Sequence, residues 1–294
     1  MTVHGPGASS RIASAGVLSS DEVTIRKCEA LEDMQACFAL QKEVWKFSDA
    51  ELVPERMFVV AAKIGGQVMG AFVPRSDRGK DASEGRTNEA RDCERNKSNE
   101  LIGFALAIPG MRNGHPYLHS QMLAVRQQYQ NRGLGRRLKL YQRDDALARG
   151  FELMEWTFDP LEIKNAYLNI EKLGAIARRY NVNQYGITSS PLQGGLPSDR
   201  LVAEWWMKSK RVDAVLAGAP RVEFEWRVRV EVPAQIGEWK ADATTRARAL
   251  AVQDDNRGHL QRAFADGLSV LGYERDERGN GRFLLGEWDE AWRY

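Results

Sequence analysis

The feature that most constrains the fold of this chain lies within residues 118–150. There, a strand is followed by a polar loop with two close glycines and then by a helix. An apolar run ends at Leu123–Val125, and Gln130-Asn131-Arg132-Gly133-Leu134-Gly135 then leads into an amphipathic helix expected over Gly133–Gly150. Two glycines let the backbone approach a ligand closely. The start of a helix offers N–H groups without intrahelical acceptors and a positive dipole end. The segment therefore predicts an anion cradle suited to a pyrophosphate, and four arginines add positive charge to it: Arg126, Arg132, Arg136 and Arg137.

Two familiar glycine loops do not fit this segment. A Walker loop needs GxxxxGK followed by Ser or Thr, whereas Gly133-Leu134-Gly135-Arg136 has neither that spacing nor that ending. A dinucleotide fingerprint needs GxGxxG, but Gly135 is followed by Arg136, Arg137 and Leu138. Both nucleotide-binding classes are therefore excluded.

The QxxGxG pattern after a strand and at the start of a helix resembles motif A of the GNAT superfamily of CoA-dependent N-acyltransferases. The resemblance covers about residues 21–190, where the expected order of strands and helices also matches. Further segments are similar to a less characterised branch of predicted acetyltransferases: Glu43–Trp45, Glu51–Pro54, Thr157–Leu161, Asn165-Ala166 and Lys172–Ala175. The implied fold class is α/β (α+β): a GNAT fold whose mixed, mostly antiparallel central sheet is flanked by helices, with a C-terminal α/β extension.

The resemblance also implies where acetyl-CoA or another acyl-CoA binds. The backbone at the end of the motif A strand would bind the pantetheine arm, the N–H groups of the glycine loop would bind the pyrophosphate, and the strand at 152–158 would splay away to admit the thioester. Two side chains of the following helix would reach the CoA. The implied residues are Leu123, Ala124, Val125, Gln130, Asn131, Arg132, Gly133, Leu134, Gly135, Arg136, Asn165 and Lys172.

One departure from the family pattern concerns the general acid. The usual ending is Tyr-Glu-Lys-x-Gly-Phe, whose Tyr often protonates the leaving thiolate, but here Ile170 and Ala175 stand at the Tyr and Phe positions. Tyr167 lies about one helical turn earlier and would face the same side. Tyr167 is therefore the candidate acid, and a thiolate that leaves unprotonated is the alternative.

An acceptor amine that arrives as an ammonium must lose a proton before it attacks. His119 is the candidate base, because it lies on the central strand, on the face that alternation assigns to Gln121 and Leu123, and because histidine titrates near neutrality. A structural role in the core is the competing interpretation. Asp159 is a candidate for the substrate ammonium, with a helix N-cap before Pro160 as its alternative. Arg178 and Arg179 lie near the place expected for an acceptor carboxylate, unless they are solvated surface charge.

Composition argues against nucleic-acid-binding, membrane, disulfide-rich and metal-binding proteins. The 42 Lys and Arg balance 40 Asp and Glu, so the net charge of +2 predicts no nucleic-acid partner and no anionic membrane surface. Cys28, Cys37 and Cys93 form no CxxC pair, which excludes a disulfide scaffold, and no metal-ligand spacing occurs. No apolar run approaches the roughly 18 residues of a membrane span. A cytoplasmic location follows by default, and the oligomeric state, a homodimer included, stays open.

Three domain segments are expected: a disordered tail over 1–20, the GNAT domain over 21–190, and a C-terminal extension over 191–294 that packs on the GNAT sheet. The charged stretch 74–100 predicts a disordered insertion between two strands. Residues 188–200 are linker-like, and Val222–Val232 alternates as a half-buried strand. Trp205, Trp206 and Trp226 are expected to join the extension to the sheet or to wall an acceptor pocket.

Two further elements are expected from local patterns. Met57–Lys63 and Gln67–Val73 predict a hairpin, and residues 236–268 predict a long helix broken near 254–258.

The sequence thus predicts an enzyme that transfers an acyl group, from acetyl- or succinyl-CoA, to the amine of a small molecule, an amino acid among the candidates. The alternative is a non-catalytic acyl-CoA-binding regulatory module, which the missing general acid favours.

Overall fold

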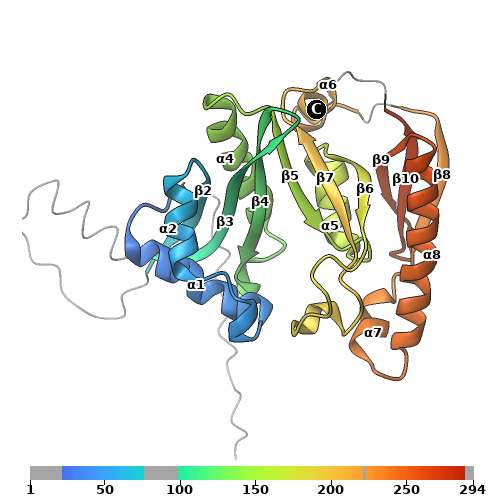
Figure 1. The fold of residues 1–294 in the computed structure, drawn as a ribbon, viewed down its shortest axis with the longest axis horizontal. Coiled ribbons are helices and arrows are strands. Elements are labelled where there is room, and N and C mark those ends of the chain that lie inside the picture. The colour runs from blue at the N-terminus through green and yellow to red at the C-terminus, as the bar shows by residue number, and fades with distance from the viewer. Residues whose placement is uncertain (1–21, 76–98, 221–222, 289–294) are drawn as a thin grey trace, which may run out of the picture.

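The computed structural model describes residues 22–75, 99–220 and 223–288, which build one ten-stranded sheet. The order across the sheet is β1-β2-β3-β4-β5-β7-β6-β9-β10-β8, and Figure 1 shows it running from β2 on the left to β8 on the right. The strands are β1 (Thr24–Lys27), β2 (Gln67–Pro74), β3 (Asn99–Arg112), β4 (His115–Val125), β5 (Leu153–Phe158), β6 (Ile176–Asn181), β7 (Arg200–Trp206), β8 (Trp226–Val232), β9 (Leu268–Arg275) and β10 (Gly281–Glu287). Neighbouring strands are antiparallel except for β4 and β5, which are parallel. The predicted mixed, mostly antiparallel sheet is confirmed.

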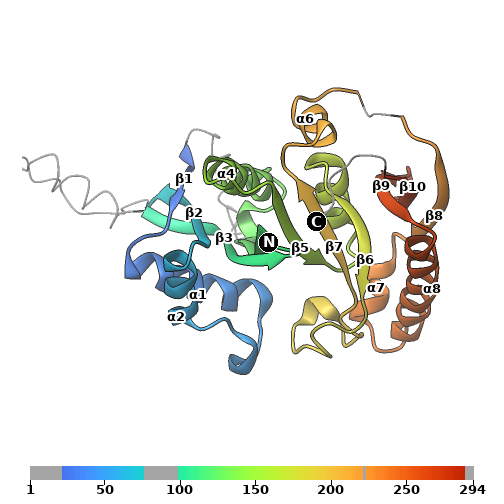
Figure 2. The same ribbon diagram turned by 45° about the horizontal axis from the view of Figure 1, so that its top comes forward.

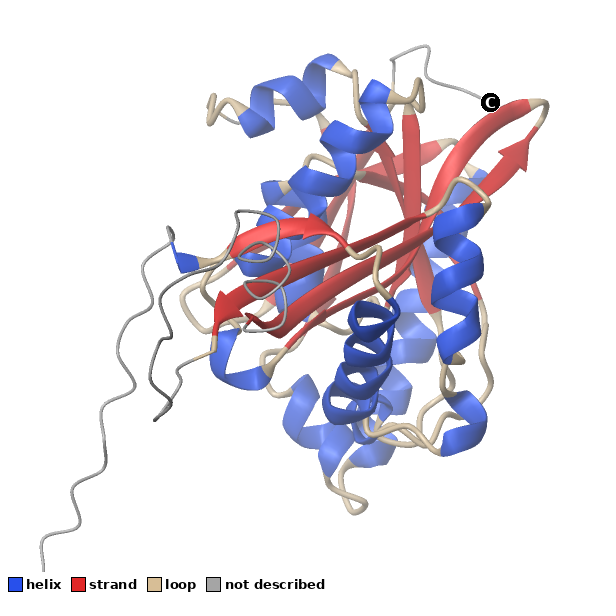
Figure 3. Ribbon diagram, turned by 90° about the vertical axis from the view of Figure 1, so that its left-hand side faces the viewer, coloured by secondary structure: helices blue, strands red, loops and turns tan. Residues whose placement is uncertain are grey.

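Helices flank this sheet on both sides, as Figure 3 shows. They are α1 (Leu31–Trp45), α2 (Glu55–Lys63), α4 (Leu134–Ala148), α5 (Ile163–Tyr167), α6 (Lys210–Leu216), α7 (Ile236–Ala241) and α8 (Arg246–Ala265). Helices α1 and α2 pack on one face of β2–β4, and α4 packs on the other (Figure 2). A third and larger apolar cluster joins β5, β7, β9 and β10 to α5 and α8.

The predicted hairpin before residue 75 is wrong in its first strand. Met57–Lys63 belongs to α2, where Phe58 and Ala61, three residues apart, are the buried positions. That spacing places both side chains on one helical face, which a short apolar run does not distinguish from a strand. Strand β2 pairs with β1 and β3 instead. Residues 76–98 of the predicted insertion and the tail 1–20 lie outside the described residues.

The predicted break in the long C-terminal helix is misplaced. Helix α7 ends at Ala241 and α8 begins at Arg246, so residues 254–258 lie inside a continuous helix. The break falls at Asp242, whose carboxylate accepts a hydrogen bond from the Thr244 N–H at 2.8 Å. An Asp side chain bonded to the backbone two residues later is a typical turn, and here it ends the first helix.

The linker-like stretch 188–200 is an anchored part of the core. Ser198 and Asp199 are fully buried, and the Asp199 carboxylate accepts hydrogen bonds from the Tyr180 hydroxyl at 2.6 Å and from the Arg257 guanidinium at 2.7 Å. Directly after it, β7 inserts between β5 and β6. Composition predicts a loop correctly here, but these bonds fix it in place.

The predicted tryptophan core holds for two of its three members. Trp205 and Trp206 on β7 are buried, and the Trp205 indole N–H donates to the Leu173 carbonyl at 2.6 Å. Trp226 is 50% exposed at the start of β8, the outermost strand. Because β8 has a neighbouring strand on one side only, the side chain at its first residue is open to solvent along the edge of the sheet.

Candidate active site

The glycine loop after β4 forms an open helix start. Gly133 has a φ of +75° and stands as the N-cap of α4, which begins at Leu134. A left-handed conformation strains residues with a Cβ, so glycine is the residue that suits it. The first-turn amides of α4 have no acceptor within the helix and point out of its end. The loop therefore has the geometry of an anion site.

Gly135 brings this helix start close to the end of β4. A Cβ at Gly135 would lie 3.4 Å from the Leu123 Cδ2 atom, which is a tight contact. Gln130 fixes the loop from the other side, because its side-chain amide donates to the Val125 carbonyl at 2.8 Å. The end of the strand and the first turn of the helix thus form one continuous surface.

The four predicted arginines differ in their partners. The Arg136 Nε donates to the Lys172 carbonyl at 3.3 Å, and the Arg132 guanidinium lies 6.0 Å from the Tyr129 ring centroid. Arg126 instead pairs with Glu43 and Glu100, and Arg137 donates to the Val23 carbonyl at 2.9 Å. The charge of Arg126 is therefore neutralised by two carboxylates, whereas the role of Arg132, Arg136 and Arg137 at the cradle stays a prediction.

Strands β4 and β5 separate immediately beside this surface. Their ladder contains two pairs, Leu118 with Met154 and His119 with Glu155, and beyond His119 the two strands part, as Figure 1 shows toward its lower edge. Residues 120–125 of β4 consequently have no partner on β5. Parted strands leave a row of backbone donors and acceptors to which an extended group can add.

A β-bulge decides which way His119 faces. The register of β3 on β4 shifts between Leu106 and Ala107, where Gln121 is the extra residue. Leu123 packs against apolar side chains of α4, and Ser120 bonds to side chains of α4 as well. Residues three apart on a regular strand face opposite sides, so the extra residue must have reversed the alternation between them. His119 therefore lies on the opposite face from Leu123, together with its partner Ile108, which packs with the α1 and α2 cluster. The prediction that His119 and Leu123 share a face is wrong.

His119 lies half-buried at the point where the strands part. Burial lowers the pKa of its imidazole, and the positive charges of Lys139 and Arg179 lower it further. Both effects disfavour the imidazolium. The ring is consequently neutral at pH 7, the state in which it accepts a proton.

Beside His119 lies a buried ionic cluster that composition and motif did not reveal. Glu155, paired with His119 across the ladder, forms ion pairs with Arg112 and Arg179. Glu204 on β7 bonds to the Arg178 guanidinium at 2.8 Å and to the Arg179 Nε at 3.0 Å. Burial raises the pKa of Glu155, although the two arginines oppose that shift. Three guanidiniums thus face two carboxylates next to His119.

On the other face of the same junction lies Lys139, a second residue that the sequence did not single out. It is 4% exposed, and its Nζ donates to the Ser120 hydroxyl at 2.7 Å and lies 3.7 Å from the Trp156 ring centroid. Burial lowers its pKa well below the usual lysine value. The pattern of residues in α4 places position 139 on the buried face, which is the signal that could have identified it.

The candidate acid and the last two candidate CoA-binding residues lie on the helical segment after Pro160. Tyr167 ends α5 with the Lys172 ammonium 5.3 Å from its ring centroid, and Lys172 in turn accepts the bond from Arg136 through its carbonyl. Asn165 is exposed, and its side-chain oxygen lies 3.4 Å from the Asn169 amide nitrogen. Lys172 therefore contacts the first turn of α4 and Tyr167 contacts Lys172, whereas the contact given for Asn165 is with Asn169. The roles of all three residues stay predictions.

Asp159 is already engaged by the protein. Its carboxylate accepts the Leu161 N–H at 2.8 Å and the Lys240 ammonium at 2.8 Å. The predicted N-cap is wrong, because α5 begins at Ile163 with Glu162 at the N-cap position, and the bond to Leu161 instead closes a turn before the helix. Because both oxygens have protein partners, Asp159 does not enter the function proposed below.

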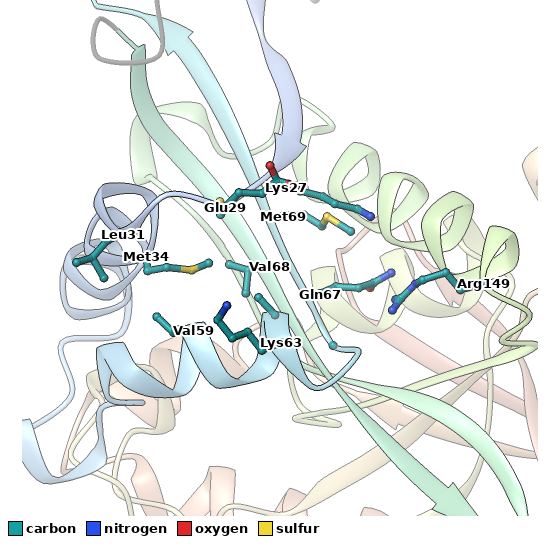
Figure 4. Close-up of a pocket in the computed structure, with 13 residues that line it drawn as sticks. Lys27, Glu29, Leu31, Met34, Val59, Lys63, Gln67, Val68, Met69 and Arg149 are labelled. Carbon is teal, nitrogen blue, oxygen red and sulfur yellow. The ribbon is translucent and has the colours of Figure 1, made fainter. Parts of the chain in front are cut away.

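Two hollows of about 420 and 430 Å³ lie away from the glycine loop. The first is bordered by α1, α2 and β2, with Lys63, Gln67 and Arg149 among its lining residues (Figure 4). The second lies between Tyr167 and the ends of β9 and β10. Neither includes Gly133 or Gly135. Among the described residues no cluster of metal-ligating side chains occurs, and no helix is long and apolar enough to cross a membrane.

Comparison with known proteins identifies the domain. Residues 72–167, from β2 through α5, match the family model of the acetyltransferase (GNAT) family. The chain therefore carries an acetyltransferase domain of the GNAT family, and the predicted enzyme class is confirmed. No curated protein matches the sequence.

Solved structures similar to this chain are also acetyltransferases. They include the ribosomal-protein-S18-alanine N-acetyltransferase of Escherichia coli, with 18% identity, 64% of this chain and 97% of that chain covered, and a TM-score of 0.42. A GNAT family acetyltransferase from Elizabethkingia anophelis with acetyl-CoA bound has 14% identity, covers 64% and 100%, and has a TM-score of 0.39. An aminoglycoside acetyltransferase from an uncultured soil sample, in complex with sisomicin, has 14% identity, covers 50% and 84%, and has a TM-score of 0.37.

Proposed function

We propose that this protein transfers an acyl group from acyl-CoA to the amine of a small molecule that also carries a carboxylate, as an amino acid does. The observation that carries the proposal is the position of His119. It lies where β4 and β5 part, beside a buried cluster with one more guanidinium than carboxylate. A neutral base next to excess positive charge suits an acceptor that has both an ammonium and a carboxylate.

The CoA would bind along the surface that joins β4 to α4. The free edge of Leu123, Ala124 and Val125 offers backbone bonds to the pantetheine arm, and the N–H groups from Gln130 to Arg136 offer donors to the pyrophosphate. Lys172 borders the same surface through its contact with Arg136, and Asn165, exposed earlier on the same helical segment, is the second side chain proposed to reach the CoA. The absence of a Cβ at Gly133 and Gly135 keeps the loop open to the phosphates.

The chemistry assigned to His119 is the removal of one proton. The ring accepts a proton from the acceptor ammonium, and the free amine nitrogen then forms a bond to the thioester carbon. The carbon–sulfur bond breaks as the tetrahedral species collapses, and the nitrogen releases a second proton to solvent to give the neutral amide. Tyr167 is the proposed donor of a proton to the departing thiolate. Because the pKa of His119 is lowered, it stays able to accept a proton at pH values below its usual titration range.

Replacement of His119 by Asn tests this role. We expect kcat/KM to fall by about 10²–10⁴, while the dissociation constant for CoA, measured by calorimetry, stays the same. Tyr167→Phe should reduce kcat with a smaller effect at high pH, where the thiolate needs no proton. Full activity of His119→Asn with an unchanged pH profile would show that His119 is structural.

A panel of acceptors tests the carboxylate. Each amino acid is compared with the amine that lacks its carboxylate, such as phenylalanine with phenethylamine, by release of free thiol from acetyl-CoA. We expect the amino acids to have the lower KM, and Arg178→Met should narrow that difference. Equal KM values for both classes would contradict the carboxylate while leaving acyl transfer intact.

A further inference from the structure

The hollow between α1, α2 and β2 lies at the edge of the sheet, away from the proposed acyl-transfer site (Figure 4). Strand β1 ends at Lys27, opposite Met69, so Gln67, two residues earlier on β2, pairs with β3 alone. This leaves space between the two helices and the end of α4. The volume of about 420 Å³ is in the range of small-molecule sites.

Gln67 supplies this hollow with a buried acceptor that the protein leaves unused. Its side chain is 2% exposed, and its Nε2 donates to the Gln142 carbonyl and to the Asp145 carboxylate, both at 2.8 Å. These two bonds fix the orientation of the amide. The Oε1 atom has no hydrogen-bond partner among the described residues, although buried polar atoms normally have one. A ligand with an N–H or O–H group would supply the missing donor.

The cations that line the hollow differ in whether they are neutralised. Lys27 and Arg149 both pair with Asp145, at 2.6 and 2.9 Å. Lys63, exposed in the last turn of α2, has no hydrogen bond or ion pair to another residue that the structure describes. With Glu29 also on the lining, three cations lie beside two carboxylates. The hollow therefore favours an anion and disfavours a ligand of positive charge.

Apolar side chains form the wall on the side of α1 and α2. Leu31, at the start of α1, is 54% exposed, and Met34 and Val59 also line the hollow. Figure 4 shows these three side chains on the side of α1 and α2, and Gln67 and Arg149 on the side of α4. An apolar group placed against Leu31 would remove exposed hydrocarbon from water.

We propose that this hollow binds a small carboxylate that carries a neutral amide N–H and an apolar group, which is the chemistry of an N-acylated apolar amino acid. The carboxylate would pair with Lys63, the amide N–H would donate to the Gln67 Oε1, and the apolar group would pack on Leu31. The product of the transfer proposed above has this chemistry. The hollow would then be a product site; that identification rests on the proposed function, whereas the binding itself does not.

Calorimetric titration of the full chain with N-acetyl-L-leucine, in the absence of acyl-CoA, tests the binding. Three matched ligands each lack one group: N-acetyl-L-leucinamide lacks the carboxylate, isocaproate lacks the amide N–H, and N-acetylglycine lacks the apolar side chain. We expect each of them to bind about tenfold more weakly than N-acetyl-L-leucine. In Lys63→Met, N-acetyl-L-leucine and its amide should bind with equal affinity.

Lys208→Met is the matched control, because Lys208 is exposed, lies outside the hollow and pairs with Glu152 at the surface. This variant should bind all four ligands as the wild type does. Arg178→Met separates the hollow from the proposed acceptor site. Affinity for N-acetyl-L-leucine that is lost in Arg178→Met but kept in Lys63→Met would place the ligand at the acceptor site and overturn the inference.

Two further results would also overturn the inference: no binding of N-acetyl-L-leucine, or equal affinity of the wild type for all four ligands. Neither result affects the release of thiol from acetyl-CoA, on which the proposed function depends. If thiol release fails while binding depends on Lys63, the hollow stays a site for such carboxylates and only its identification as a product site is lost.

Discussion

Two buried lysines, Lys139 and Lys240, show what a partner does for a cation in this protein. Their exposed fractions are 4% and 3%. Lys240, on α7, contacts Asp159 and Glu162 at 2.8 Å each, whereas Lys139, on α4, contacts a hydroxyl and an aromatic ring. Burial alone lowers the pKa of both, but the two carboxylates outweigh that effect at Lys240 and raise its pKa. The two sites differ in their partners and hardly in their burial.

The two lysines also lie in different parts of the molecule. Lys240 connects the C-terminal residues to the turn between β5 and α5, and its charge is fully neutralised there. Lys139 lies inside the matched GNAT residues, at the opening between β4 and β5. A chain gains nothing in stability from an unpaired buried charge. The stability of the fold therefore does not explain the position of Lys139, whose contacts among the described residues are the Ser120 hydroxyl and the Trp156 ring.

The largest effect on folding should come from deleting the C-terminal residues, which contain Lys240. We propose that residues 191–294 extend the GNAT sheet and are needed for it to fold. A chain that ends at Ser190 lacks β7, which lies between β5 and β6, and so loses the partner that both strands share. We expect no cooperative thermal transition by circular dichroism. A soluble, monomeric fragment that unfolds cooperatively would contradict this domain assignment.

The next effect should follow from Lys240→Met. The substitution leaves the Asp159 carboxylate buried without its counterion, and breaking a buried pair in this way costs about 3–5 kcal/mol. Urea denaturation should show that loss in the free energy of unfolding. Lys208→Met, at an exposed pair, should change the same quantity by roughly 1 kcal/mol or less. Equal losses in both variants would mean that burial does not distinguish them.

A smaller effect than that of Lys240→Met should come from Lys139→Met and should have the opposite sign. Removing an unpaired buried charge should raise the free energy of unfolding by roughly 1–3 kcal/mol. The folded-state pKa of Lys139 is below its unfolded value of about 10.4, so its penalty is absent above that pH and grows as the pH falls toward the folded pKa. The Tm advantage of Lys139→Met should therefore shrink as the pH rises from 7 to 10. An advantage that grows with pH would show that Lys139 has a carboxylate partner.

Local sequence signals predicted the framework of the candidate site well. Strand β2 and helix α4 differ from the expected bounds by a few residues, and β4 ends at Val125 as expected. Motif A identified the family because its glycines and its strand–loop–helix order lie within one short segment. Periodicity failed where the segment was short, as at Met57–Lys63, and where a helix end depends on one side-chain bond, as at Asp242.

The partners of charged side chains were not predictable in the same way. Arg126 was expected at the cradle but pairs with Glu43 and Glu100, and Asp159 was a candidate for the substrate but pairs with Lys240. Each pair joins residues distant in sequence, so no local pattern encodes it. The cluster of Arg112, Glu155 and Glu204 was missed for that reason.

The sequence by itself determined the GNAT class and the glycine cradle, because both depend on backbone conformations that neighbouring residues set. The tertiary structure decided which face His119 occupies, since a single extra residue in β4 reverses the alternation of the strand. It also decided which buried charges are neutralised, since the sequence alone does not show which partners Lys139 and Lys240 have. That distinction depends on which strands and helices fold against each lysine, and the contacts come from residues far along the chain.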